Sequence, residues 1–449
     1  MTEANPSEPE FDRHEFNRRE FNRREFLGSS AKNAAGVAVG MVGLSGATAQ
    51  ATVPVSAGDR LAVGVVGVRG QGLTLATRLA AMPDVAVTTI CDIDQRLLDE
   101  AATALEEGQG GLPRRESDFR RLLDDPTLDA IVVATPDHWH APMAVQACLA
   151  GKDVYLESPV GHTIQEGWLL VNVARESGRV IQSGLQQRSG EHFRSAIEYV
   201  RGGKLGEVRL AKAWTVHRRK SIGFRADAKP PEHVDYAAWL GPAPLRPFNP
   251  NRFHRNWNWF WDYGCGELGK WGVQMIDIAR WGLDVDWPRR VSSVGGKYHF
   301  NDDQETPDTQ SVHYDFGGTS IVWEHRQWSN RGIEGRSAAV SFHGERGTLI
   351  VDRGGWKVYG AKDNVTADAS DLLGPHLCDF IDAIRTRREP SANILTGHVS
   401  SGLCHLGNIS HRLGREVTFD AATSSCNNDD AANALLTKPY RDGWTLPVV

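Results

Sequence analysis

A glycine-rich turn between a short apolar run and an amphipathic stretch constrains the fold of this chain more than any other feature. Residues 61–66 (LAVGVV) are typical of a buried strand, and the turn GVRGQG follows directly at 67–72. Residues 73–81 have helical periodicity, and a second apolar run at 85–90 ends at Cys91-Asp92. This order of strand, glycine turn, helix, strand and acidic residue predicts a dinucleotide-binding βαβ unit.

Five residues of the turn are expected to contact the cofactor: Gly67, Arg69, Gly70, Gln71 and Gly72. Glycine lets the backbone approach a pyrophosphate, and the free N–H groups of a helix N-terminus attract an anion. Arg69 stands where a G-x-G-x-x-G motif has its middle glycine, so Gly70 can supply the missing flexibility. Asp92 is placed to accept hydrogen bonds from ribose hydroxyls, and its charge would repel a 2′-phosphate. The sequence therefore favours NAD over NADP.

Three further apolar runs extend the pattern to a doubly wound parallel sheet. They cover 130–134, 154–156 and 180–182, and the first two lead into TPDHWH at 135–140 and Glu157-Ser158-Pro159. Ligands of open α/β sheets bind at the carboxyl ends of the strands. We therefore expect the glycine turn and Asp92 to share one crevice with both loops, and we assign to NAD the residues Thr135, Pro136, Asp137, His140 and Glu157.

Length and charge narrow the remaining possibilities. A chain of 449 residues is expected to form at least two domains. The formal net charge of −6 argues against a nucleic acid or an anionic membrane as partner, and no apolar run is long enough to span a bilayer. Asp137, His138 and His140 lie close together, but the spacing of the sequence fixes no ligand beyond this cluster, so no metal is predicted.

The first 51 residues resemble an export signal. Two arginines, a spacer and Phe-Leu occur at 23–27, followed by a weakly apolar run at 34–47 and small-x-small patterns at 47–51. This pattern predicts export by the twin-arginine route to the periplasm or otherwise out of the cytoplasm. The route carries folded proteins, which suits a chain that must acquire its cofactor before export.

Four segments make the chain resemble the Gfo/Idh/MocA oxidoreductases, specifically their exported bacterial branch. They are ATPDHWHAP at 134–142, GKDVY at 151–155, WDYGCGELG at 261–269 and DDQETPDTQ at 302–310. The resemblance implies a Rossmann domain (58–183) followed by an α/β domain with a large, mostly antiparallel sheet (184–420). It also implies NAD(P), a sugar-like or polyol-like substrate, and a homo-oligomer, either a dimer or a tetramer.

The resemblance also implies that Thr135, Pro136 and His140 lie near the nicotinamide. The polar composition after residue 420 predicts a flexible tail over 421–449.

The proton-handling positions depart from the family pattern. The family's usual lysine of a Glu-Lys-Pro motif is replaced by Ser158, and its usual aspartate and histidine on a later helix are replaced by Lys270 and Gln274. Serine alone and glutamine cannot act as the base that oxidation of a carbinol requires, whereas a lysine with a lowered pKa can.

At helical spacing, Lys270, Gln274 and Asp277 would share one face. If that face meets the crevice, Lys270 supplies the missing ammonium and Asp277 can pair with it. The alternative is a solvated Lys270 and lost or altered chemistry.

Residues near the second domain's motif are candidates for substrate binding. Aromatic faces stack on sugar C–H surfaces, and indole N–H groups donate to hydroxyls. The chain has dense aromatics at 257–261, for which core packing or subunit contact is the alternative. As substrate-binding residues we assign His138, His254, Trp261 and Tyr263.

Three functions remain open at this point. The first is an NAD-dependent sugar or polyol oxidoreductase with a tightly held cofactor. The second is a glycoside-cleaving enzyme that uses NAD for transient oxidation followed by elimination. The third is a non-catalytic protein that binds a sugar and keeps the nucleotide site.

Overall fold

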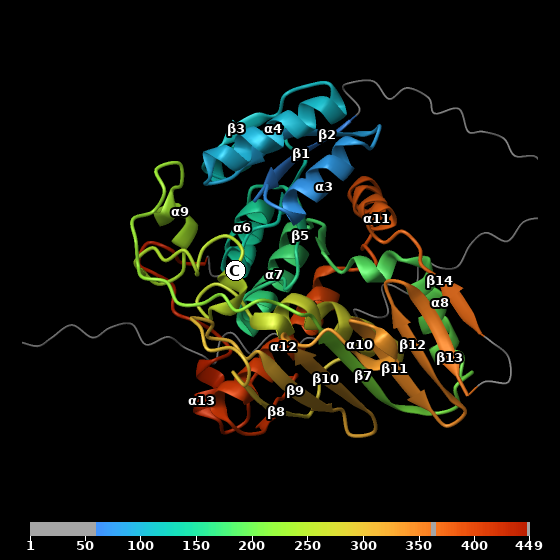
Figure 1. The fold of residues 1–449 in the computed structure, drawn as a ribbon. Coiled ribbons are helices and arrows are strands. Elements are labelled where there is room, and N and C mark those ends of the chain that lie inside the picture. Colours follow the sequence, from blue (N-terminus) through green and yellow to red (C-terminus); the bar gives the residue numbers. More distant parts are fainter. Residues whose placement is uncertain (1–59, 361–364, 447–449) are drawn as a thin grey trace, which may run out of the picture. The chain divides into compact units, whose positions relative to one another are not determined.

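The computed structural model describes residues 60–360 and 365–446, which form two sheets and their covering helices (Figure 1). The predicted export signal at 1–51 lies outside the described residues. No helix of the described ranges is both long enough and apolar enough to cross a membrane.

The first sheet is a six-stranded parallel sheet in the order β3-β2-β1-β4-β5-β6, as the predicted Rossmann fold requires. Its strands are apolar because helices cover both faces of the sheet. All four residues of β4, for example, are buried. The strands are β1 (Leu61–Val66), β2 (Val85–Cys91), β3 (Arg114–Glu116), β4 (Ala130–Val133), β5 (Asp153–Leu156) and β6 (Ile181–Ser183).

Helices cover both faces of this sheet. On one face β1 packs against α3 (Gln71–Ala80) and α4 (Gln95–Gln109), and the distant helix α11 (Leu373–Thr386) returns to complete the same hydrophobic core. The other face is covered by α5 (Arg120–Leu123), α6 (Asp137–Leu149) and α7 (Ile164–Ser177).

The second sheet has nine strands in the order β14-β13-β12-β11-β7-β10-β9-β8-β15. Neighbouring strands run antiparallel except for β10 and β7, so the predicted fold class is confirmed. The strands are β7 (Val208–Val216), β8 (Arg290–Gly296), β9 (Thr309–Asp315), β10 (Ser320–Arg326), β11 (Ala338–Gly344), β12 (Gly347–Asp352), β13 (Gly355–Tyr359), β14 (Thr366–Asp368) and β15 (Val417–Thr418).

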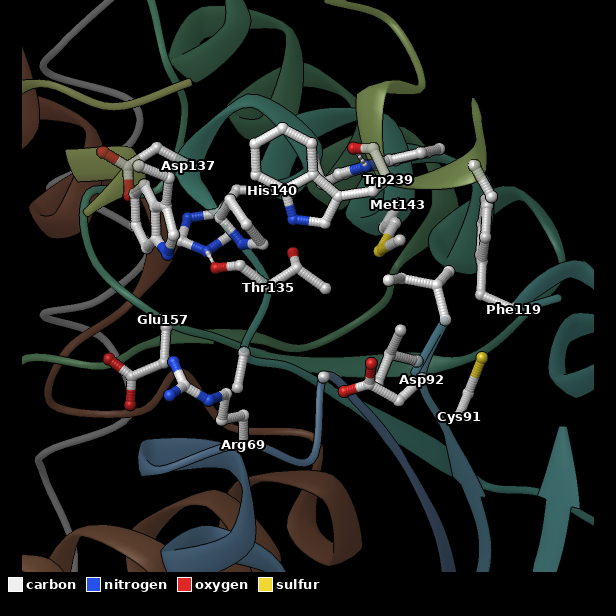
Figure 2. Close-up of a pocket in the computed structure, with 18 of the residues that line it drawn as sticks. Arg69, Cys91, Asp92, Phe119, Thr135, Asp137, His140, Met143, Glu157 and Trp239 are labelled. Atoms are coloured by element: carbon white, nitrogen blue, oxygen red, sulfur yellow. Dashed lines mark hydrogen bonds between the residues drawn. The ribbon is translucent and has the colours of Figure 1, made fainter. Parts of the chain in front are cut away.

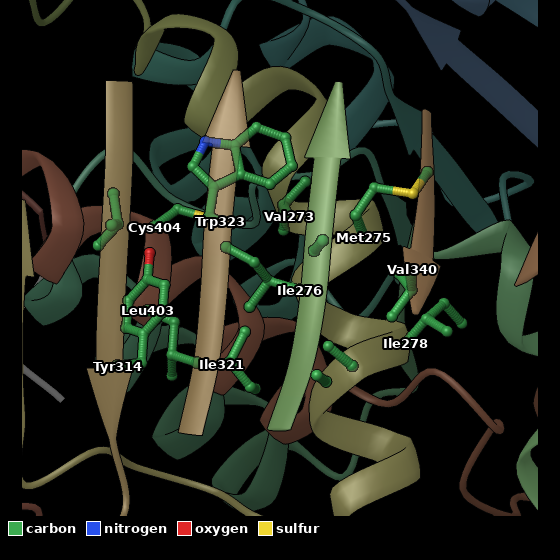
Figure 3. Packing of buried hydrophobic residues seen from close by; sticks show 14 of the residues in the cluster. Val273, Met275, Ile276, Ile278, Tyr314, Ile321, Trp323, Val340, Leu403 and Cys404 are labelled. Carbon is green, nitrogen blue, oxygen red and sulfur yellow. The ribbon is translucent and has the colours of Figure 1, made fainter. Parts of the chain in front are cut away.

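One face of the second sheet packs on α8 (Glu191–Arg201), α10 (Val273–Leu283) and α12 (Ile394–Leu413). The alternation along β10 sends Ile321 and Trp323 to this face. Figure 3 shows both side chains against Val273 and Ile276 of α10. This packing fixes the N-terminal end of α10, which leads to the site described below.

The segment after β15 is packed rather than flexible, so the prediction for 421–449 is wrong for residues 421–446. Cys426, Ala432 and Leu436 are buried around the short helix α13 (Asp430–Ala434). Lys438 forms an ion pair of 2.9 Å with the buried Glu166 of α7. The composition is polar because few side chains of the segment face inward, and those few determine its position.

Candidate active site

A cavity of about 810 Å³ lies at the carboxyl edge of the parallel sheet. Its walls come from the ends of five strands, β1, β2, β3, β4 and β5, and from several segments of the second domain. Figure 2 shows Asp92 and Phe119 toward one end, and Asp137 and Glu157 toward the other. The loops that the sequence predicts to converge do so in this cavity.

The glycine turn has the backbone that a pyrophosphate site needs. Gly67 has φ +84°, and a Cβ there would lie 2.7 Å from the Ala134 carbonyl oxygen. A Cβ on Gly72 would lie 1.7 Å from the Gly67 oxygen, so this glycine supports the turn from behind and does not line the cavity. No side chain caps the N-terminus of α3, and Gly70 and Gln71 face the cavity there.

Asp92 is fixed by the backbone at the end of β2. Its carboxylate accepts hydrogen bonds from the backbone N–H groups of Val68 at 3.0 Å and Asp94 at 3.1 Å. Burial raises the pKa of Asp92 to about 6. Nearby, Arg69 lines the cavity, and burial together with the charge of Arg255 lowers the pKa of its guanidinium.

The loop after β4 contributes Thr135, Pro136, Asp137 and His140 to the wall. The Oγ1 atom of Thr135 is buried without a hydrogen-bond partner among the described residues. The ring nitrogens of His140 lie 2.6 Å from the Pro159 carbonyl oxygen and 2.9 Å from that of Thr135. His140 therefore ties the β4 and β5 loops together. The uncapped helix, the close glycine backbone and the unpartnered Thr135 hydroxyl all fit a bound dinucleotide.

Glu157 connects the β5 loop to the glycine turn. Its Oε1 accepts hydrogen bonds from the side-chain amides of Gln71 at 3.1 Å and Gln186 at 3.2 Å. Burial raises the pKa of Glu157 to about 7.

Ser158 and Gln274, predicted to stand at two of the family's proton-handling positions, contact each other. The Gln274 amide donates to Ser158 Oγ at 2.9 Å and to the Gly184 carbonyl at 2.7 Å. Ser158 Oγ in turn donates to the same Gly184 carbonyl at 3.2 Å. Ser158 lines the cavity, whereas Gln274 stands behind it. Neither group carries a charge.

Lys270 is one of the cationic residues of the cavity wall. It lies in a π-helical turn (Leu268–Gly272) that precedes α10, and its Nζ is 5.3 Å from the centre of the Trp259 ring. Burial and the charge of Arg219 lower the pKa of Lys270, while Glu267 and Asp137 oppose them. π-helical turns occur frequently at functional sites.

Asp137 lies near Lys270 in the same wall. The backbone and thiol of Cys265 hydrogen-bond to its carboxyl, which is only 2% exposed. Burial raises the pKa of Asp137 to about 7, although these hydrogen bonds and Lys270 act in the opposite direction. An amine and a carboxyl with shifted pKa values thus share one end of the cavity.

Asp277 does not pair with Lys270, contrary to the sequence-based expectation. Its carboxylate accepts two hydrogen bonds from Arg188 at 2.7 and 2.9 Å and one from Ser400 at 2.7 Å, away from the cavity. The expectation assumed α-helical spacing, but Lys270 lies in a π-helical turn, which has more residues per turn. Lys270 therefore does not share a helix face with Gln274 and Asp277.

Of the four predicted substrate-binding residues, His254 lines the cavity. Its Nε2 lies 3.0 Å from Asp94 Oδ2. The others are elsewhere: His138 Nε2 contacts the Trp239 carbonyl at 3.0 Å, the Tyr263 ring packs on Trp239, and the Trp261 ring faces Arg412. The structure thus places His138 and Tyr263 in an aromatic core, where their side chains position the loop.

Several lining residues have no sequence signal that assigns them to the site. Phe119 and Met143 belong to ordinary apolar positions, and Arg441 and Trp444 come from the segment predicted to be flexible. Trp257 lies in the aromatic stretch that the sequence marks as a candidate, while its neighbours Trp259 and Phe260 are core residues.

Comparisons with known proteins agree with this geometry. A family model described as an oxidoreductase family with an NAD-binding Rossmann fold matches residues 37–185, and one described as its C-terminal alpha/beta domain matches 220–446. A glycosyl hydrolase family 109 protein of Saccharopolyspora erythraea is 31% identical over 208 residues, which are 42% of this chain and 45% of that protein. A second, from Shewanella sp. (strain ANA-3), is 32% identical over 163 residues, 35% and 36% of the two chains. The chain thus spans less than half the length of these relatives.

Solved structures show the same fold at low sequence identity. Levoglucosan dehydrogenase in complex with NADH and levoglucosan is 19% identical, with a TM-score of 0.63, over 80% of this chain and 99% of that chain. An aldose-aldose oxidoreductase from Caulobacter crescentus, complexed with glycerol, is also 19% identical, with a TM-score of 0.63, over 80% and 100% of the two chains.

Proposed function

The chain belongs to the Gfo/Idh/MocA oxidoreductase family and has its NAD-binding Rossmann domain; on this premise, we propose that it oxidises or reduces a CH–OH group of a sugar, polyol or derivative, with Lys270 as the proton-handling residue. The observation that carries the proposal is the position of Lys270. It lines the same cavity as the glycine turn, Thr135 and Glu157.

When bound, NAD supplies the acceptor for the hydride that leaves the carbinol carbon. Gly70, Gln71 and Asp92 hold the cofactor, and Thr135 Oγ1 is free to donate to it. Lys270, in its neutral form, accepts the hydroxyl proton of the substrate, and burial makes that form accessible by lowering its pKa. The neighbouring Asp137 carboxylate stabilises the ammonium that results.

Replacing Lys270 with methionine tests this role, because methionine keeps the apolar stem and removes the amine. We expect Lys270→Met to lower kcat by 10²- to 10⁴-fold, the range for loss of a general base, with bound NAD retained. The measurement is the near-ultraviolet absorbance of the nicotinamide after addition of each member of a sugar panel. Lys357→Met, which lies on β13 away from the cavity, is the matched control.

Two results would contradict the proposal. Full activity in Lys270→Met would remove Lys270 from the chemistry. Sugar binding without any absorbance change in the wild type, across the whole panel, would instead favour a binding protein.

A second candidate function is glycoside cleavage by transient oxidation and elimination. It is supported by the partial similarity to proteins named as glycosyl hydrolase family 109 members. In this case the protein should release the aglycone from aryl glycosides without net formation of NADH. Absence of release from both α- and β-glycosides would count against it.

The export signal and the oligomer are also part of the proposal. The twin-arginine pattern at 23–27 supports export, and replacing Arg23 and Arg24 with lysine should keep the protein in the cytoplasmic fraction. The nine-stranded sheet offers a broad face for a second copy, and sedimentation should then show a dimer or tetramer.

A further inference from the structure

The segment from Lys438 to Trp444 reaches the cavity from the far end of the chain. Arg441 and Trp444 line it together with residues of the Rossmann domain. Both side chains are half-buried. Arg441 is held by two neighbours: its main-chain N–H donates to the Pro242 carbonyl at 3.1 Å, and its guanidinium donates to the Ala237 carbonyl at 3.3 Å.

A buried anchor holds this segment in place. Lys438 Nζ lies 2.9 Å from Glu166 Oε1 and 3.0 Å from His162 Nδ1. The Tyr440 hydroxyl donates to the same Glu166 oxygen. Glu166 is 2% exposed, so the ion pair is shielded from water and fixes the residues that follow it.

Within this segment, Trp444 lies toward the end of the cavity that holds Asp92. The Trp444 ring meets the Trp139 ring edge to face, with centres 4.9 Å apart, and Trp139 meets Phe119 in the same manner at 5.7 Å. In Figure 2, Phe119 and Asp92 lie on one side of the cavity, and Asp137 and Glu157 on the other. Because Asp92 marks the ribose next to adenine, the Trp444 end is the adenosine end.

We propose that Trp444 and Arg441 are binding residues for the adenosine half of NAD, which the C-terminal segment delivers to the cavity. An indole provides a face for a purine ring, and a guanidinium can contact either the base or the phosphates. No ion pair occupies the Arg441 guanidinium within the ranges the structure describes. The segment closes this end of the cavity and slows release of the cofactor.

The test separates the two halves of the dinucleotide. AMP and nicotinamide mononucleotide are titrated separately into protein freed of bound nucleotide, and the rate of NAD release is measured by dilution into excess competitor. For Trp444→Ala we expect AMP binding to weaken about tenfold or more, as for loss of one base–aromatic contact, with NAD release faster by a similar factor. Binding of nicotinamide mononucleotide should not change.

Three further variants sharpen the result. Trp444→Phe keeps an aromatic face and should retain most of the AMP affinity, and Arg441→Ala should weaken AMP but not nicotinamide mononucleotide. Trp328→Ala, two residues after β10 and outside the cavity, is the control for loss of a tryptophan.

Unchanged AMP affinity in Trp444→Ala would overturn the proposal. Equal weakening of both mononucleotides would also overturn it, because a residue at one end cannot contact both halves.

Discussion

Replacing Asp137 with asparagine should stabilise the cofactor-free protein at alkaline pH and change its stability little at pH 4. The carboxyl is 2% exposed, so its charged form loses most of its hydration. Asparagine has nearly the same shape, and its carbonyl oxygen can still accept hydrogen bonds from the Cys265 backbone and thiol. The substitution therefore removes the charge with little change in packing.

The magnitude follows from the two pKa values. Burial raises the pKa of Asp137 from 3.8 to about 7, and each pKa unit corresponds to about 1.4 kcal/mol. A folded pKa above the unfolded one means that the unfolded state loses its proton first as pH rises. The contribution of Asp137 to the free energy of unfolding is therefore greatest below pH 3.8. It decreases progressively up to pH 7, by about 4 kcal/mol in total. Asp137→Asn should recover most of this amount at pH 8.

Urea unfolding of cofactor-free wild type and variant at pH 4.5, 6 and 8 measures the effect. Other buried acids, such as Glu157, titrate in both proteins and cancel in the difference. Asp368→Asn, an exposed carboxylate on β14, is the control and should change the midpoint little at any pH. A difference between Asp137→Asn and wild type that is the same at pH 4.5 and 8 would refute the reasoning, as would destabilisation that grows with pH.

Two further predictions concern supports of the site. Gly72→Ala forces a Cβ to within 1.7 Å of the Gly67 oxygen, so we expect NAD affinity in calorimetric titration to fall at least tenfold; unaltered affinity would mean that the turn shifts freely. Glu267 is buried, but hydrogen bonds from His217 and the charge of Arg219 lower its pKa to about 2. The ionised carboxylate therefore stabilises the folded protein fully above pH 4.5, and this contribution is lost as the pH falls toward 2. Glu267→Gln should lower the free energy of unfolding at pH 7 by about 3 kcal/mol in urea titration; a loss below 1 kcal/mol would contradict this.

The Rossmann half of the site was predictable because each of its residues follows directly from a local pattern. The strand at 61–66 ends where Gly67 must turn, and parallel strands place their carboxyl ends at one edge. Asp92, Thr135 and Glu157 therefore fall in one cavity without any knowledge of tertiary contacts. The sequence also indicated that Lys270 could face this cavity, as it does.

The second half depends on contacts between distant segments, which no local pattern carries. The partner of Asp277 is Arg188, 89 positions earlier, and Trp444 meets Trp139 across 305 positions. The π-helical turn at 268–272 has no distinctive residue pattern, yet it changes which side chains share a face with Lys270. His138 likewise lies in a loop that the sequence assigns to the binding site, but its ring packs in the aromatic core.

We interpret the three residues predicted at the family's proton-handling positions, Ser158, Lys270 and Gln274, as one coupled change. Ser158 Oγ accepts a hydrogen bond from the Gln274 amide, and both side chains are neutral. A lysine at 158 would meet the Gln274 amide donor and would add a second ammonium to the wall that already carries Lys270. Like charges in a shielded cavity repel each other, so a second ammonium near Lys270 would favour the neutral form of one of the two lysines. The neutral pair at 158 and 274 is therefore compatible with a cation at 270, whose charged form the nearby Asp137 carboxyl favours.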